Sequence, residues 1–168
     1  MRRLAVALLV GLMSVATQTL ARPPGHYVNA RFGYSIDFPP TLVRALPESD
    51  NSDGRRFLLR RGGSGRAWVW GNFASEDRTL RTEAAALEAR CDGGRATYRV
   101  LRARMMAVSC PSRGRILYQK TLSNERIMVS FSADYPASER QTWDRIVAQM
   151  SGSLRKLCGS AEEGPCGD

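Results

Sequence analysis

The feature that most constrains the fold is a long run of alternating apolar and polar residues late in the chain. In the segment 126–135 one face carries Ile127, Val129, Phe131, Ala133 and Tyr135, and the other carries Ser130, Ser132 and Asp134. A period of two residues is that of a β-strand with one apolar face. The strand-like segment 115–122 precedes it across the short turn Ser123-Asn124-Glu125, so the two segments are expected to pair as antiparallel strands.

Other segments show the same strand character. They are 32–38, 56–60, 67–72, 97–101 and 105–110. Gly62-Gly63-Ser64-Gly65 joins the second and third of them as a turn, and it lacks the following Lys-Ser or Lys-Thr of a phosphate loop. Trp68 and Trp70 project from the same side of their strand, and we expect them to cover the core rather than to form a ligand platform.

Two segments have helical periodicity. In 80–90 the apolar positions recur at spacings of four, three and four, with Thr79 as a candidate cap. The second helix is expected to start with the capping box Ser138-Glu139-Arg140-Gln141 and to carry an apolar stripe from Trp143 to Leu154. Strands, a helix, more strands and a closing helix predict an α+β domain, with a central, mostly antiparallel sheet of six to seven strands flanked by helices.

Several segments resemble bacterial PsbP-like domains. They are Phe32-Gly33-Tyr34-Ser35-Ile36-Asp37-Phe38-Pro39, the Asp53-Gly54 turn, Tyr135-Pro136, Ile146-Val147 and Ser153-Leu154. That family is similar in fold to the extrinsic PsbP subunit of photosystem II and to a Ran-binding nuclear import factor. The resemblance covers roughly residues 27–157 and implies an antiparallel sheet with helices on both sides, an α/β/α sandwich. Its motifs are framework residues, so it implies a fold and no activity.

The N-terminus has the pattern of a secretory signal peptide. Met1-Arg2-Arg3 is followed by an apolar run to Met13, and Thr19-Leu20-Ala21 supplies small residues for cleavage after position 21, with cleavage after Ala16 as the second choice. The alternative is a membrane anchor, but the apolar run is shorter than the ~20 residues of a spanning helix. Many bacterial PsbP-like proteins resemble lipoproteins, whereas this signal region has no cysteine. We expect a periplasmic or secreted protein.

The expected domain organisation follows from these segments. Residues 1–21 form the cleaved signal peptide, 22–26 a flexible leader, 27–157 one α+β domain and 158–168 a disordered or disulfide-tied tail. The four cysteines fit two structural disulfides in an oxidising compartment, because their spacing suits neither a metal site nor a C-x-x-C redox pair. Local pairing joins Cys91 to Cys110 and Cys158 to Cys166.

The chain is strongly basic, with a formal charge of +9 that rests almost wholly on arginine. Most arginines are scattered, which is typical of a solvated basic surface. The densest basic segment surrounds the Gly-rich turn and is the candidate patch for an anionic partner, such as an anionic polymer or lipid. This patch consists of Arg55, Arg56, Arg60, Arg61 and Arg66.

Catalytic signals are weak. His26 is the only histidine and lies in the expected leader, so no Ser-His-Asp machinery or multi-histidine metal site is predicted. Glu48, Asp50 and Asp53 cluster in a polar turn that does not follow the ligand order of a calcium loop. No catalytic residue, cofactor or metal is assigned.

The sequence therefore favours an exported, non-enzymatic binding or accessory domain of the bacterial cell envelope, with an envelope protein as partner. One alternative is a polyanion-binding module that uses the basic hairpin 55–66. A second is a hydrolase with a carboxylate site that motifs do not reveal.

Overall fold

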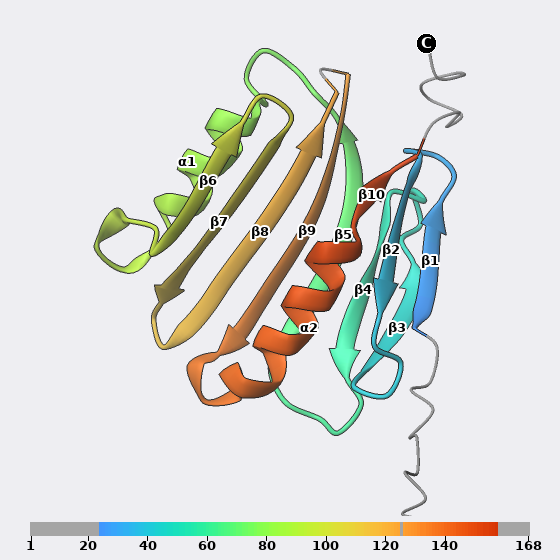
Figure 1. The fold of residues 1–168 in the computed structure, drawn as a ribbon, viewed down its shortest axis with the longest axis vertical. Helices are drawn as coiled ribbons and strands as arrows, with labels where there is room; N and C mark the ends of the chain where they lie inside the picture. Colours follow the sequence, from blue (N-terminus) through green and yellow to red (C-terminus); the bar gives the residue numbers. More distant parts are fainter. Residues whose placement is uncertain (1–23, 125, 158–168) are drawn as a thin grey trace, which may run out of the picture.

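The computed structural model describes residues 24–124 and 126–157, which form two antiparallel sheets and two α-helices (Figure 1). The large sheet runs in the order β3 (Val43–Glu48), β4 (Gly54–Leu59), β5 (Arg66–Phe73), β9 (Ile127–Pro136), β8 (Arg115–Ser123), β7 (Met105–Ser112) and β6 (Tyr98–Arg102). The small sheet runs β1 (Gly25–Asn29), β2 (Tyr34–Phe38) and β10 (Arg155–Lys156). The helices are α1 (Leu80–Glu88) and α2 (Arg140–Ser153). This is the predicted α+β fold with a seven-stranded antiparallel sheet.

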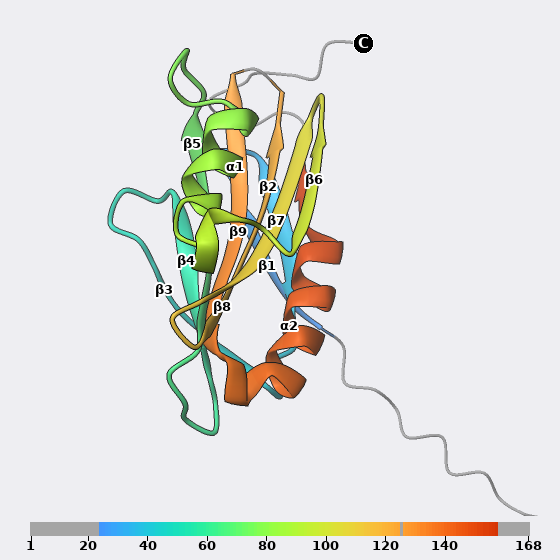
Figure 2. The same cartoon turned by 90° about the vertical axis from the view of Figure 1, so that its left-hand side faces the viewer.

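The two helices lie on opposite faces of the large sheet (Figures 1 and 2). Helix α2 and the small sheet cover one face and enclose the main core, in which Trp143, Ile146 and Met150 of the helix pack against the apolar side of β9. Phe57 and Val69 extend this core across β4 and β5. The predicted alternation of β9 therefore holds, because its odd-numbered residues face α2.

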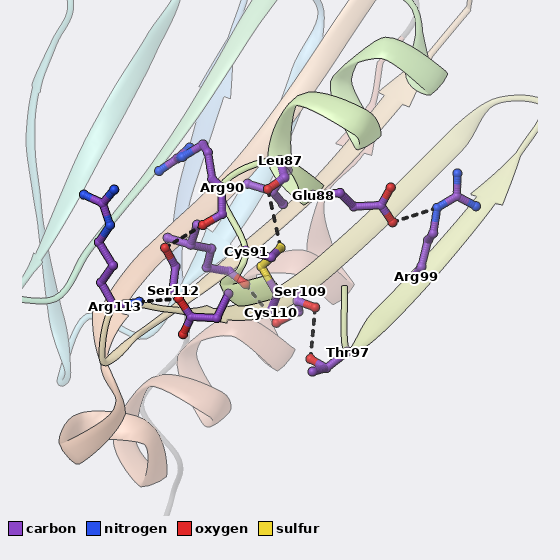
Figure 3. The surroundings of a disulfide bond; sticks show 12 residues. Leu87, Glu88, Arg90, Cys91, Thr97, Arg99, Ser109, Cys110, Ser112 and Arg113 are labelled. Atoms are coloured by element: carbon purple, nitrogen blue, oxygen red, sulfur yellow. Dashed lines mark hydrogen bonds and ion pairs between the residues drawn. A yellow bond between two sulfur atoms is a disulfide. The ribbon is translucent and has the colours of Figure 1, made fainter. Parts of the chain in front are cut away.

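Helix α1 encloses a second, smaller core on the opposite face. Leu80, Ala84 and Leu87 pack against Met106 and Val108 of β7. The disulfide between Cys91 and Cys110 closes this core and ties the end of α1 to β7, as predicted (Figure 3).

Polar contacts flank the disulfide (Figure 3). The Glu88 carboxylate pairs with Arg99 of β6 at 2.9 Å, and the Ser112 hydroxyl donates to the Arg90 carbonyl at 2.7 Å. The Asp92 carboxylate accepts from the Arg113 amide at 3.0 Å. Helix α1 is thus held to the sheet by covalent, ionic and apolar contacts together.

The start of α2 differs from the prediction. A short 3₁₀ turn, Ala137–Glu139, precedes the helix, and the capping residue Glu139 makes no side-chain hydrogen bond to the helix backbone. Instead its carboxylate accepts from the Trp143 indole at 3.0 Å and from the Ser64 amide at 3.1 Å. The predicted capping box is wrong because Ser138 lies within the 3₁₀ turn and α2 begins only at Arg140, while Glu139 joins the helix to the β4–β5 loop.

Order also begins earlier than expected. Gly25 and His26, placed in the flexible leader by the sequence, belong to β1, where they pair with Phe38 and Asp37 of β2. Strands β3 and β10 were not predicted either. The signal segment 1–21, the tail 158–168 and the Cys158–Cys166 pairing lie outside the described residues. Within the described part of the chain, no helix has the length and apolar character needed to cross a membrane.

Candidate functional site: an exposed tryptophan and arginine face

Helix α1 covers only part of its side of the large sheet. It packs against β6, β7 and β8, and the outer side of β3, β4 and β5 has no helix over it in the described residues (Figure 2). The side chains on this outer side are half-buried or exposed. We call this surface the open face, and it consists of Leu46, Arg56, Leu58, Arg66, Trp68 and Trp70.

The centre of the open face is a pair of tryptophans on β5. The rings of Trp68 and Trp70 stack with centroids 6.2 Å apart and an interplanar angle of 25°. The expectation that they cover the core is wrong, because neither indole belongs to a core cluster: Ala67 and Val69 on the opposite side of β5 pack into the core, and both indoles are half-buried. A large aromatic pair left partly in water is typical of a binding surface.

Small residues on the inner side of β5 explain this orientation. Phe32 packs so closely over Gly71 that an added Cβ would lie 2.3 Å from its ring. This close approach leaves no room for an indole at this position on the core side of β5. Gly54 of β4 lies on the opposite, outer side as the strand partner of Trp70, where an added Cβ would lie 2.9 Å from the Trp70 Cβ.

A buried polar strip on β8 and β9 lies beside the tryptophans. Ser132 and Ser130 of β9 are the direct strand partners of Trp68 and Trp70. The hydroxyls of Ser130 and Thr121 lie 2.9 Å apart, and Thr121 accepts from the Gln119 amide at 3.2 Å. Hydrogen bonding within the strip offsets the cost of burying these groups and fixes the surface beneath the indoles.

A groove of about 510 Å³ runs from the two tryptophans to the loop between β3 and β4. This loop is held by the Ser49 hydroxyl, which donates to Asp53 at 2.5 Å, and by Asn51, which donates to the same carboxylate at 2.9 Å. A second hollow of about 450 Å³ lies over Leu46, Leu58 and Trp68. The open face is therefore concave in two places as well as partly apolar.

Hydrogen bonds also join the loop between β3 and β4 to the small sheet. The Tyr27 hydroxyl donates to Glu48, and the Asn29 amide donates to the Ser52 carbonyl at 2.8 Å. Tyr34 donates to the Asp53 carbonyl at 2.8 Å. Burial is the main cause that raises the pKa of Tyr27 and of Tyr34, so both phenols are neutral donors at neutral pH.

The arginines of the predicted anionic patch do not form one cluster. Arg55 extends toward the small sheet, where its guanidinium lies 4.6 Å from the centre of the Tyr27 ring. Arg60 and Arg61 follow β4 at the start of its loop, and the Arg60 guanidinium donates to the Pro40 carbonyl at 2.5 Å. Strand alternation sends Arg55 away from the open face, whereas Arg60 and Arg61 lie beyond the last residue of β4.

Two arginines of that patch do accompany the tryptophans. Arg56 is the strand partner of Trp68, and the Arg66 guanidinium lies 5.8 Å from the centre of the Trp68 ring. Arg66 also pairs at 3.3 Å with the buried carboxylate of Asp134, which Arg115 contacts as well. Of the predicted patch, the structure thus places Arg56 and Arg66 on the open face, together with the two indoles that the sequence analysis had expected to cover the core.

The remaining titratable candidates are dispersed. His26 Nδ1 lies 2.6 Å from the Asp37 carboxylate, a pairing that sequence reasoning missed because it joins two strands 11 residues apart. Both side chains are exposed at the edge of the small sheet. In the described ranges, no group of three or more histidine, cysteine, aspartate or glutamate side chains is placed to hold a metal ion.

Comparison with solved structures identifies the fold. The solution structure of cyanobacterial PsbP from Synechocystis sp. PCC 6803 aligns over 87% of this chain and 99% of its own length, with a TM-score of 0.57 and 14% identity. A crystal structure from Bacteroides thetaiotaomicron aligns over 78% of this chain and 47% of its own, with a TM-score of 0.50 and 9% identity. The fold is PsbP-like, as the sequence resemblance implied.

A third solved structure is LpqN, described as involved in cell envelope biogenesis of Mycobacterium tuberculosis. It aligns over 80% of this chain and 91% of its own, with a TM-score of 0.49 and 16% identity. No family model matches the sequence, and no curated protein matches it. The structural alignment with cyanobacterial PsbP supports the fold alone, so the function has to be argued from the site itself.

Proposed function

We propose that this protein is a non-enzymatic binding or accessory domain of the bacterial cell envelope, and that it holds its partner on the open face. One observation carries the proposal. Trp68 and Trp70 lie half-buried, with part of each indole in water, on a sheet face that no helix covers within the described residues, and Arg56 and Arg66 lie beside them. Tryptophan and arginine are the residues most enriched at the energetic centres of protein interfaces.

The disulfide and the N-terminal sequence support a location outside the cytoplasm. The Cys91–Cys110 bond closes the smaller core, and structural disulfides persist in oxidising compartments. The basic and apolar start of the chain has the pattern of a signal peptide. The two features point to the same compartment through independent physical arguments.

Contacts of the acidic residues support a binding role over catalysis. Asp134 is buried, and its two carboxylate oxygens face Arg66 and Arg115, so this group is engaged in structure rather than poised as a base. We expect the mature protein to show no turnover of esterase, phosphatase, peptidase, glycosidase or peptidoglycan substrates, with or without divalent metals. Turnover that disappears in a folded Asp37→Asn variant would instead establish the hydrolase alternative.

The decisive experiment is site-specific cross-linking in envelope extract. A photoreactive amino acid placed at Arg56 should capture one defined species in stoichiometric amount, because this position adjoins both indoles on the open face. The same probe at Tyr98, an exposed aromatic position on the far edge strand, is the matched control. Capture from both positions, or from neither, would contradict the proposal.

A double substitution tests the same surface without a probe. Trp68→Ser with Trp70→Ser should abolish capture from Arg56 while the far-ultraviolet spectrum and cooperative unfolding persist. Tyr98→Ser should leave capture unchanged. If the tryptophan variant still yields the same cross-linked species, the open face is not the binding surface.

The second candidate, a polyanion-binding module, is favoured by the placement of Arg56 and Arg66 beside the indoles. Polyanion binding releases counterions and weakens steeply with salt. Under this alternative, capture from Arg56 would spread over many anionic species and vanish between about 50 and 200 mM salt. A single species that survives this range supports the protein partner.

A further inference from the structure

Another concave surface lies at the end of the large sheet, where β5 leads into α1 and β6 turns into β7; Figure 1 shows the position of these two connections. Its volume is about 710 Å³, larger than that of either hollow on the open face. We call it the arginine pocket, and its principal lining residues are Ser75, Arg78, Thr79, Arg81, Leu101 and Arg102.

The arginine pocket carries uncompensated positive charge. Arg78 pairs with Glu83 of α1 at 3.1 Å. Within the described part of the chain, Arg81 and Arg102 form no ion pair, and no carboxylate lines the pocket. Glu76 and Asp77 are exposed in the preceding turn, outside the lining. Two arginines without a counter-charge therefore line the same hollow.

The position of Arg81 makes this excess unfavourable in the free protein. Arg81 is the second residue of α1, and a helix start carries a partial positive charge that disfavours a cation. The acidic residue of this first turn, Glu83, is already engaged by Arg78 and by the Gln119 amide at 3.2 Å. An anion in the pocket would relieve the repulsion that the chain's own acidic groups leave in place.

The backbone that presents these arginines is well ordered. Thr79 and Thr82 form a reciprocal capping box at the start of α1, and the Thr82 hydroxyl also donates to the Asp77 carbonyl at 3.0 Å. The Arg78 amide donates to the Ser75 carbonyl at 3.0 Å. Because these bonds fix the turn, binding would not have to order it first.

We propose that the arginine pocket is a binding site for a phosphate-type anion, distinct from the open face. Guanidinium groups match the oxygen geometry of phosphate, and the Ser75 hydroxyl adds a neutral donor. Leu80 and Leu101 form an apolar wall beside the charged groups, which suits an anion attached to a small apolar part. A soluble phosphoester and an anionic lipid headgroup share this chemistry.

The test uses the mature chain and inorganic phosphate and pyrophosphate as probes, at constant ionic strength set with sodium chloride. Titration followed by heat release and by melting temperature should show saturable binding. Arg81→Gln with Arg102→Gln should weaken that binding about tenfold or more, because charge-assisted hydrogen bonds are lost. Equal weakening in the control Arg61→Gln with Arg145→Gln would mean general charge attraction and would overturn the proposal.

A second arm identifies the source of the phosphate group. Phosphatidylglycerol vesicles, compared with phosphatidylcholine vesicles, should sediment the wild type and not the Arg81/Arg102 variant if the site takes a lipid headgroup. Probe binding without vesicle binding would assign a soluble phosphoester. Absence of saturable binding in both arms, with a wild-type chain that melts cooperatively, would overturn the inference and leave the open-face proposal intact.

Discussion

Replacing Trp143 by alanine is expected to remove the largest single contribution to the main core. Trp143 has no exposed area, its ring stacks on Tyr135 at a centroid distance of 5.5 Å, and its indole donates to Glu139 at 3.0 Å. It also fills the space above Gly65, where an added Cβ would lie 2.1 Å from the indole nitrogen. The substitution therefore empties a space that α2, β9 and the β4–β5 loop share.

The magnitude follows from these contacts. Truncating a buried tryptophan to alanine typically costs about 3 to 5 kcal/mol, against a total domain stability of about 5 to 15 kcal/mol. A domain of this size loses very roughly 3 to 5 °C in melting temperature per kcal/mol, so a fall of about 10 to 20 °C is expected. Trp143→Phe keeps the stacking on Tyr135 and loses the hydrogen bond to Glu139. Its melting temperature should fall by a much smaller amount, because a hydrogen bond contributes about 1 kcal/mol.

Thermal and chemical unfolding of both variants measure this difference. Gly65→Ala provides a coupled test, because its added methyl group collides with the indole in the wild type and has room in Trp143→Ala. In a double-mutant cycle, the cost of Gly65→Ala should shrink when Trp143 is absent. A Trp143→Ala protein that melts within about 3 °C of Trp143→Phe, or a strictly additive cycle, would refute the packing described for α2.

Three further outcomes are expected. Joint replacement of Cys91 and Cys110 by serine should lower the free energy of unfolding by about 3 kcal/mol on the loop-closure model. Non-reducing peptide mapping of the wild type should recover the Cys91 and Cys110 peptides linked to each other, and linkage of Cys91 to a tail cysteine would contradict the structure. Trp68→Ala should lower the melting temperature much less than Trp143→Ala, because its ring is already partly in water. The contribution of four buried tyrosines to stability should be fully present below about pH 10 and be lost above it, because burial raises their pKa and the unfolded chain loses those protons first. If the unfolding free energy of Tyr34→Phe has the same slope against pH as that of the wild type, this cause is wrong. The four are Tyr27, Tyr34, Tyr118 and Tyr135.

Lys120 acts on the pH profile in the opposite sense. Desolvation lowers the pKa of its ammonium group, which donates to the Ser151 carbonyl at 2.7 Å. The unfolded chain therefore binds the extra proton in the interval below the ordinary lysine pKa of 10.5, and stability from this group rises with pH there. One lysine against four tyrosines leaves the net fall above pH 10 as the expected result.

The parts of the fold that the sequence predicts are those with strong local periodicity. Strand β9 is buried on both sides but carries its large apolar residues on one of them, and helix α2 buries one regular stripe, so both patterns can be recognised in the sequence. Strand β3 was missed because Pro47 and a register shift between Ala45 and Glu48 break its alternation. Strand β10 has only two residues, and its pairing with β2 depends on chain positions far away in sequence.

The orientation of the tryptophans in the candidate site also depends on contacts that local sequence patterns do not reveal. Alternation places Trp68 and Trp70 on one side of β5, but it does not say which side, because Ala67, Val69 and Gly71 on the other side are apolar as well. The choice is made by the close packing of Phe32 on Gly71, a contact between distant segments. Small residues flanking two tryptophans are the signal that could have indicated an outward orientation.

The pairing of β2 with the end of the chain has a consequence for the order in which the molecule can form. Asp37 donates its amide to the Ser153 hydroxyl across 116 positions, and the Leu157 amide donates to the Gly33 carbonyl at 2.6 Å. The early strands therefore complete their packing only after residues 140–157 have been synthesised. If the chain is exported, as proposed above, the segment that reaches the export channel is still unfolded.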